Sequence, residues 1–124
     1  MIKMLSFNRK KDGISAEQYR DYYENVHAPL IRSLFPTVGT YRRNYVDRDR
    51  TALTERNAEA ARDQADFDSV TEAFFEDWAA FAAFRDKNAE PEVRARVLAD
   101  EANFLEPAAI RRYIVTPDGD SAWS

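Results

Sequence analysis

Four short segments with strand-like patterning are separated by two longer stretches of helical periodicity, and this order leaves few folds open. The expected strands run from Ile2 to Arg9, from Thr40 to Val46, from Phe67 to Phe75 and from Ala108 to Thr116. This order is that of a ferredoxin-like βαββαβ domain, with one strand, a helix, two strands, helices and a last strand. Such a domain is an α+β fold with helices on one face of a four-stranded antiparallel sheet. The chain of 124 residues has room for one such domain.

The first helical stretch opens with a clear N-terminal signal. Ser15 is followed by Gln18 at the spacing of a capping box, and the apolar pattern beyond it predicts a helix over residues 16–34. Pro29 has no amide to bond the carbonyl four residues earlier, and a proline disfavours helical angles in the residue before it. We therefore expect the helix to kink or restart at Pro29, which would leave a backbone carbonyl free beside His27.

Two helices are expected between the third and fourth strands. Asp77 is a suitable N-cap for the first, and Pro91 suits the first position of the second because no amide bond is lost there. The charged segment 47–65, with few large apolar residues, is interpreted as a long surface loop that could close over a ligand as a lid. A polar tail over residues 118–124 follows the domain, which we place at residues 1–117.

Charge and composition exclude several classes of function. The net charge is −4, with acidic and basic residues interspersed, so the chain offers no basic face for nucleic acid. It has no cysteine and a single histidine, which excludes disulfides, thiolate metal sites and a cysteine nucleophile, and leaves only a carboxylate metal site open. No apolar run is long enough to span a membrane and no signal sequence opens the chain, so we expect a cytoplasmic protein without a membrane partner.

The single histidine is the most informative residue for chemistry. His27 follows Tyr19, Tyr22 and Tyr23 on the expected helix and lies two positions before Pro29. An imidazole can both accept and donate a proton near neutral pH, so a histidine beside a helix interruption and aromatic side chains is a candidate acid/base at the wall of a pocket. The alternative is a structural histidine that packs and bonds a nearby carbonyl.

Apolar residues on both faces of the strands predict a partner chain. The helices of such a fold cover one face of the sheet, and bulky residues on the other face would stay exposed in a monomer. Pairing two sheets face to face removes this exposure, so we expect a homodimer. The space between each sheet and its helices could then hold a hydrophobic or aromatic small molecule.

Three motifs resemble those of EthD-domain proteins. They are Tyr19-Arg20-Asp21-Tyr22-Tyr23-Glu24-Asn25-Val26-His27-Ala28-Pro29-Leu30, the passage from Phe67-Asp68 to Phe74-Phe75-Glu76-Asp77-Trp78, and Asp100-Glu101-Ala102-Asn103-Phe104. The resemblance spans nearly the whole chain and implies a dimeric α/β barrel. Similar proteins include polyketide cyclases, dehydratases or decarboxylases and a methylmuconolactone isomerase, and none of these needs a metal or an organic cofactor.

The resemblance also implies roles for particular residues. In isomerase-like relatives, a histidine near the end of the first helix and a tyrosine on the next strand face the ligand. By position these correspond to His27 and Tyr41, with Tyr45 on the same strand face as the alternative. This chain lacks the additional cysteine and histidine residues of the isomerase, which argues against the lactone rearrangement itself. The candidates for binding substrate are Tyr19, Tyr23, Tyr45, Trp78, Asn103 and Phe104. Core packing is the simpler role for the first two tyrosines and the tryptophan, and a bond to the backbone near Pro29 is the favoured alternative for Asn103.

The expected function is that of a cofactor-independent enzyme acting on an aromatic, polyketide-like or lactone carbonyl compound. The histidine would move a proton next to the carbonyl while a tyrosine of the second strand and Asn103 hold the developing oxyanion, in a cyclisation, dehydration, isomerisation or decarboxylation. Asp100 and Glu101 are adjacent and cannot point the same way, so they do not predict a paired-carboxylate site. The alternatives are a cofactor-free oxygenase of polyphenols and a non-catalytic small-molecule-binding accessory protein.

Overall fold

Four antiparallel strands form one sheet in the order β2-β3-β1-β4. The structure is a computed structural model that describes residues 1–51, 53 and 67–116. Its strands are β1 (Ile2–Asn8), β2 (Tyr41–Tyr45), β3 (Ser69–Phe75) and β4 (Arg111–Val115). All four lie within the segments that the sequence predicts, and β1 has a strand on either side.

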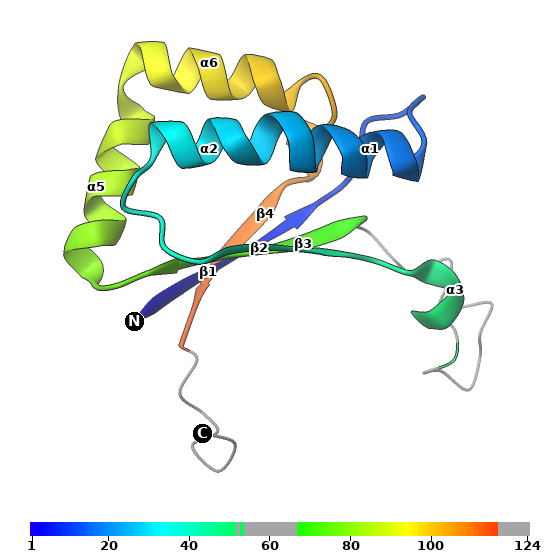
Figure 1. Ribbon diagram of the computed structural model, residues 1–124, viewed down its shortest axis with the longest axis horizontal. Helices are drawn as coiled ribbons and strands as arrows, with labels where there is room; N and C mark the ends of the chain where they lie inside the picture. Colours follow the sequence, from blue (N-terminus) through cyan, green and yellow to red (C-terminus); the bar gives the residue numbers. More distant parts are fainter. Residues whose placement is uncertain (52, 54–66, 117–124) are drawn as a thin grey trace.

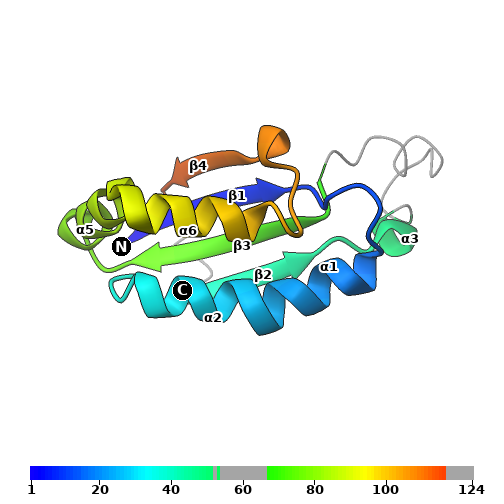
Figure 2. The same ribbon diagram turned by 90° about the horizontal axis from the view of Figure 1, so that it is seen from above.

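The principal helices form a layer over one face of this sheet (Figure 1). The helical elements are α1 (Ala16–Tyr22), the π-helical turn η1 (Tyr23–His27), α2 (Ala28–Leu34), the short α3 (Arg48–Thr51), α5 (Trp78–Ala89), α6 (Pro91–Glu101) and the 3-10 turn η3 (Pro107–Ala109). α1, η1 and α2 run as one rod above β2, α6 runs the opposite way above β1 and β3, and α5 joins β3 to α6 (Figure 2). The predicted ferredoxin-like α+β fold is therefore confirmed.

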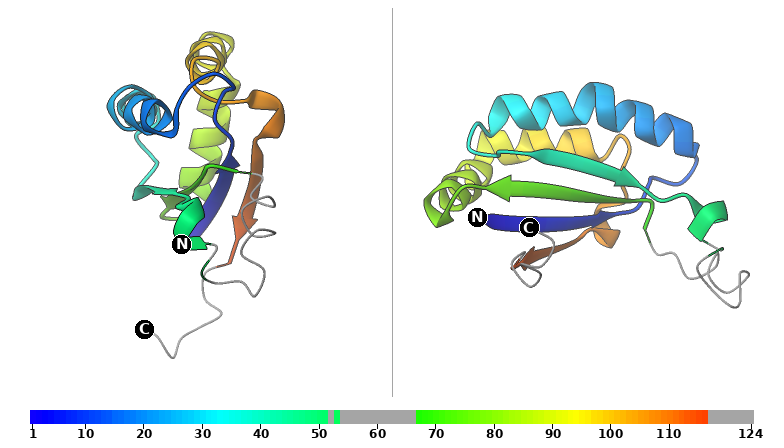
Figure 3. Two further views of the ribbon diagram at one scale, coloured as in Figure 1. Left: turned by 90° about the vertical axis from the view of Figure 1, so that its right-hand side faces the viewer. Right: turned by 60° about the horizontal axis from the view of Figure 1, so that its bottom comes forward.

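Strand register decides which side chains face the helices. Ser6 of β1 lies opposite Thr71 of β3 and Arg112 of β4, and this row faces the helices. The preceding residue of β1, Leu5, lies opposite Tyr113 and points to the other face. In the described part of the chain, no helix covers this second face, which Figure 3 shows from below with α1, α2 and α6 behind the sheet.

The first helical stretch begins as predicted but continues differently. The Gln18 amide donates to the Ser15 hydroxyl at 3.0 Å, and the Ser15 amide donates to the Gln18 side chain at 2.8 Å. No kink forms at Pro29, because Ala28 keeps helical angles (φ −60°, ψ −44°), but an α-helix does restart there, since α2 begins at Ala28. In η1 the bonds span five residues, and the Ala28 amide donates to the carbonyl of Tyr23. The amide that Pro29 lacks then falls in the first turn of α2, where a proline is tolerated.

The other local predictions hold where the structure describes them. Asp77 caps α5 by accepting a bond from the Ala80 amide at 2.8 Å, and Pro91 opens α6. Of the predicted lid over residues 47–65, the structure describes residues 47–51 and 53. The rest of the lid and the whole polar tail over residues 118–124 lie outside the described residues. None of the helices that the structure describes is long and apolar enough to cross a membrane.

Candidate functional site

A wide turn in the first helical stretch directs the histidine toward the sheet. Buried residues repeat at every fourth position along this stretch: Tyr19, Tyr23, His27, Ile31 and Phe35. An α-helix advances about 100° per residue, so residues four apart drift around it by about 40° each time. The slower winding of η1 reverses this drift and keeps all five side chains buried. The unbroken four-residue spacing is the sequence signal for this turn, and a search for ordinary α-helical periodicity misses it.

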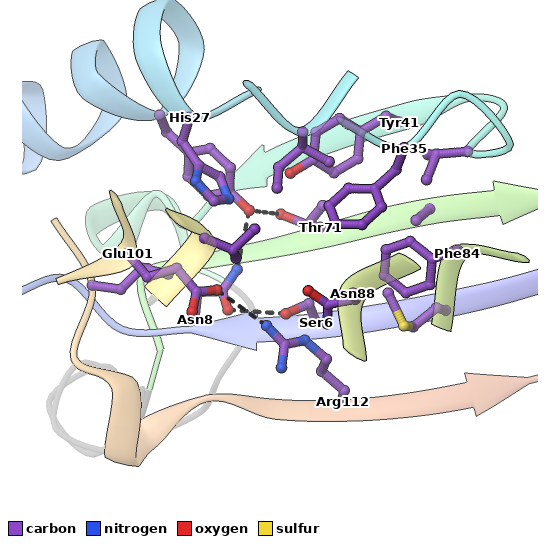
Figure 4. Close-up of a pocket in the computed structure, with 17 residues that line it drawn as sticks. Ser6, Asn8, His27, Phe35, Tyr41, Thr71, Phe84, Asn88, Glu101 and Arg112 are labelled. Atoms are coloured by element: carbon purple, nitrogen blue, oxygen red, sulfur yellow. Dashed lines mark hydrogen bonds and ion pairs between the residues drawn. The ribbon is translucent and has the colours of Figure 1, made fainter. Parts of the chain in front are cut away.

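The histidine borders a cavity between the helices and the sheet (Figure 4). Its volume is about 120 Å³. Apolar side chains from strands, helices and connecting loops form much of its wall: Met4, Ile31, Phe35, Val38, Ala73, Phe84, Val97 and Leu105. This volume of about 120 Å³ is somewhat below the roughly 150 Å³ of an apolar cavity that holds benzene, so the space is suited to no more than a single ring or one end of a larger apolar molecule.

Polar side chains gather in the same cavity. They are Ser6, Asn8, Thr71 and Arg112 from the strands, with Asn88 and Glu101 from α5 and α6. Ser6 donates to the Asn8 side chain at 2.9 Å, and the Asn8 amide donates to Tyr23 Oη at 3.2 Å. Among the described residues, no buried side-chain nitrogen or oxygen is without a hydrogen-bond partner. The cavity thus combines an apolar wall with a few fixed polar groups, as sites for small molecules do.

His27 is held by a carboxylate outside the cavity. The residue is 4% exposed, and its Nδ1 lies 2.6 Å from Oδ2 of Asp100, near the end of α6. An ionised carboxylate only accepts hydrogen bonds, so Nδ1 carries the proton and Nε2 keeps its lone pair. Because His27 lines the cavity and Asp100, which bonds Nδ1, does not, we infer that the Nε2 edge of the ring faces the cavity. The predicted bond to a free backbone carbonyl is wrong, because the helix does not break at Pro29.

Burial decides the protonation state of His27. Loss of hydration lowers the pKa of the imidazole below its ordinary value of 6.5, and this effect outweighs the opposite effect of Asp100. Arg112 and Arg43 lower this pKa further by charge repulsion. At neutral pH the ring is therefore uncharged, with a lone pair that can accept a proton.

Two further side chains fix the carboxylate of Asp100. Tyr22 Oη donates to Asp100 Oδ1 at 2.6 Å, and Asn103 Nδ2 donates to Tyr22 Oη at 2.9 Å. The sequence suggests Asn103 as a group that holds the substrate, but the structure places it at the surface, at the far end of this line of bonds. The line joins the first helical stretch to the end of α6 and holds the imidazole of His27 in one orientation.

The tautomer of His27 can be tested without a substrate. Replacing Asp100 with Asn removes the charge that raises the pKa of the imidazole, so we expect this pKa to fall further below 6.5. We also expect more of the ring to carry its proton on Nε2, because an amide can donate to Nδ1. NMR titration of the single, isotope-labelled histidine measures both quantities. Asp86→Asn, an exposed change on α5, is the control, and a titration of Asp100→Asn identical to that of the parent would contradict the arrangement.

The structure brings Tyr23 and Tyr41 to the cavity together with His27. Tyr41 is buried on β2, and its phenol interacts with that of Tyr23. Loss of hydration raises the pKa of both phenols, so both keep their protons at neutral pH. A protonated phenol in an apolar cavity can donate a hydrogen bond to a ligand oxygen.

Two other tyrosines suggested as ligand contacts do not line this cavity. Tyr19 is buried, and its hydroxyl bonds Ser69 Oγ at 2.7 Å, which fits core packing. Tyr45 lies on the inward face of β2, but its hydroxyl donates to Glu24, whose two oxygens also accept bonds of 2.8 and 2.9 Å from Arg43. Both tyrosines therefore tie the first helical stretch to the sheet and support the site from outside.

Phe104 and Trp78 also lie outside the cavity. Phe104 is fully buried against His27, with ring centroids 4.9 Å apart, so it supports the imidazole. A core position for Trp78 is wrong, because this residue is 61% exposed at the first position of α5, with its ring against the edge of Phe81. α5 begins just after β3 and stands beside the layer that α1, α2 and α6 form (Figure 1). None of these helices therefore covers its first turn, where Trp78 lies.

Six polar residues of the cavity were not predicted from the sequence: Ser6, Asn8, Thr71, Asn88, Glu101 and Arg112. Asp100 and Glu101 diverge as expected of neighbours on a helix, yet both belong to the site, since one holds the histidine and the other faces the cavity. Alternation along the last strand was the signal that could have found Arg112, because it places this side chain on the inward row with Ser6. In the part of the chain that the structure describes, no cluster of His, Asp or Glu side chains could hold a metal ion.

Comparisons with known proteins agree with this fold. The sequence matches the EthD domain over residues 11–108, and no curated protein matches it. HapK from Hahella chejuensis has a similar structure, with a TM-score of 0.62 and 17% identity, over 96% of this chain and 94% of that chain. An EthD family protein from Bacillus halodurans gives a TM-score of 0.60 and 16% identity, over 94% and 97%. A DABB family protein with a ferredoxin-like fold from Mesorhizobium loti gives 0.59 and 16%, over 95% and 97%.

The two kinds of comparison carry different weight. Structural similarity at such low sequence identity establishes a common fold and nothing about activity. The EthD match, in contrast, covers most of the chain and includes both the turn that carries His27 and the whole of α6. The chain therefore belongs to the EthD-domain family.

Proposed function

We propose that this protein is a cofactor-independent enzyme that moves a proton on a carbonyl compound of aromatic, polyketide-like or lactone type. The observation that carries the proposal is His27, which is buried against an apolar cavity with Nδ1 bonded to Asp100 and Nε2 free. A neutral imidazole oriented in this way is a general base. The apolar wall favours an aromatic or otherwise hydrophobic substrate, and the cavity volume of about 120 Å³ favours a single ring at the reacting end.

The chemistry begins with a proton transfer to the imidazole. Nε2 of His27 removes a proton from the carbon next to the carbonyl, and the electron pair of that C–H bond moves toward the carbonyl oxygen. The phenol of Tyr41 stabilises the resulting enolate oxygen by donating a hydrogen bond. Return of the proton to another carbon gives an isomerisation, loss of a neighbouring hydroxyl as water gives a dehydration, and attack of the enolate carbon on a second carbonyl gives a cyclisation.

Hydrogen exchange on a simple aryl ketone tests this proposal. In buffered heavy water, the protein is expected to exchange the methyl hydrogens of acetophenone for deuterium faster than buffer alone, because proton removal by His27 is reversible. Proton NMR follows the loss of the methyl signal. Saturable binding without exchange or product would favour a small-molecule-binding accessory protein. Oxygen uptake during turnover of a polyphenol would favour a cofactor-free oxygenase.

We further propose that the protein forms a homodimer through the open face of its sheet. This face carries half-buried or exposed apolar side chains: Leu5, Phe7, Val70, Phe74, Tyr113 and Val115. No described helix covers them, and a second copy of the chain would remove them from water. An ion pair of 2.7 Å between Lys3 and Glu72 lies among them, so the charges of these two residues are paired within the chain.

A single charge on this face should separate the two chains. Tyr113 is 55% exposed in the single chain, so Tyr113→Asp should not disturb the monomer fold, but it would place an unpaired carboxylate in the dimer contact. We expect sedimentation analysis to find a dimer for the parent and a monomer for this variant. Leu98→Asp, a comparably exposed position on α6, is the control and should remain dimeric. A parent that sediments as a monomer would contradict the proposal.

A further inference from the structure

Glu101 is a buried carboxylate that faces the same cavity as His27. It is the last residue of α6 and is only 5% exposed. Its only described partner is Arg112, whose Nη2 lies 3.3 Å from Glu101 Oε2. The other oxygen, Oε1, has no described hydrogen-bond partner. Among the described residues every fully buried side-chain oxygen has a partner, so Oε1 is not fully buried and keeps some exposed surface. Because Glu101 lines the cavity, we place this oxygen toward its free space (Figure 4).

The surroundings of Glu101 favour its protonated form more than water does. Loss of hydration raises the pKa of this carboxyl above its ordinary value of 4.5, and Asp100 on the same helix acts in the same direction. Arg112 of β4 and Arg94 of α6 oppose this effect. The Arg112 side chain is half-exposed, so water screens its charge and it neutralises Glu101 incompletely.

We propose that Glu101 is a second acid/base group of this cavity, which donates a proton to the substrate oxygen while His27 removes one from carbon. This inference rests on the proposed function above. Nε2 of His27 takes the proton of the C–H bond, whose electron pair forms the new C–C double bond of an enol. The carbonyl electron pair takes the proton of the Glu101 carboxyl, so the products are an enol, an imidazolium and a carboxylate. In a dehydration the same carboxyl protonates the departing hydroxyl, which leaves as water.

The placement of Glu101 explains why a single helix end carries two carboxylates. Neighbouring residues on a helix point about 100° apart. Asp100 therefore reaches the Nδ1 side of His27 from outside the cavity, while Glu101 reaches the cavity itself. Burial lowers the pKa of His27 and raises that of Glu101, so both shifts favour the uncharged forms, an imidazole that can accept a proton and a carboxyl that can donate one.

The single histidine gives a test that needs no substrate. An NMR titration of labelled His27 should contain a second step, from Glu101, with a midpoint above the ordinary 4.5 of a glutamic acid. This step should be absent in Glu101→Gln and retained in Glu92→Gln, an exposed change on the same helix. A parent whose histidine titrates without this step, or with the same step in Glu101→Gln, overturns the inference whatever the enzyme does.

The catalytic part of the inference is tested with the acetophenone exchange assay. We expect Glu101→Gln to lower the maximal exchange rate about 10- to 100-fold with little change in the half-saturating concentration, because the lost group acts on the reacting oxygen. Glu92→Gln should exchange at the parental rate. Exchange that depends on His27 but not on Glu101 overturns this inference and leaves the proposed function intact. Exchange that is no faster than in buffer overturns both the proposed function and the catalytic role of Glu101. The titration of the histidine is independent of this assay and still reports the protonation of Glu101.

Discussion

His27→Gln is expected to lower proton exchange on an aryl ketone by about 10²–10⁴-fold, the usual contribution of a general base. Glutamine has a similar length and can still bond Asp100, so the cavity should keep its shape. It has no group that accepts a proton near neutral pH, so the transfer step is lost. Rates of methyl deuteration in the parent and the variant, measured at equal protein concentration, give the effect.

The control for this substitution lies on the same turn of helix. Asn25→Gln changes an exposed residue of η1 and should exchange at the parental rate. Circular dichroism and thermal unfolding establish that His27→Gln is folded. Exchange at the parental rate in a folded His27→Gln protein would remove the imidazole from the mechanism, and with it the function proposed above.

Phe104→Ala is expected to give the largest loss of stability, about 3–5 kcal/mol of unfolding free energy, which is typical for a fully buried phenylalanine. Phe104 has no exposed surface, and its ring centroid lies within 6 Å of those of Tyr19, Tyr22, Tyr23 and His27. Alanine would leave a hole at the centre of this aromatic cluster, and the surrounding helices can close it only in part. Urea unfolding followed by circular dichroism measures the difference.

An exposed apolar residue provides the comparison for Phe104. Leu98→Ala, on α6 and close to half exposed, should change the unfolding free energy by about 0.5 kcal/mol or less. If Phe104→Ala also cost no more than this, the aromatic cluster would not be the support of the histidine that the structure describes. Because the imidazole rests on this ring, the variant should also lose exchange activity at temperatures where it remains folded.

The parts of the fold that depend on neighbouring residues could be predicted from the sequence. The capping box at Ser15, the N-cap at Asp77 and the opening proline of α6 are all read from residues within one turn of each other. The strands follow from alternation over a few positions. Trp78 could not be placed in this way, because its exposure depends on where α5 stands relative to the other helices.

The candidate site was predictable only on the side that the first helical stretch and β2 provide. His27 and Tyr41 follow from chemistry and resemblance, and both border the cavity. The groups that act on them lie far away in the sequence: Asp100 is 73 residues from His27, and Arg112 lies on the last strand. No local pattern shows that, of two adjacent acidic residues at a helix end, one will bond the imidazole from outside the cavity and the other will line the cavity. That division follows from tertiary packing of α6 against η1.

The wide turn at η1 makes the site sensitive to chain length in a way that point substitutions do not reveal. With one residue fewer, the segment would wind as an ordinary α-helix, and its two halves would face directions about 100° apart. Either Tyr19 before the turn, or Ile31 and Phe35 after it, would then leave the sheet, and the imidazole would move with one side or the other. The count of residues between the capping serine and the proline, more than their identity, therefore keeps the reactive nitrogen pointing inward.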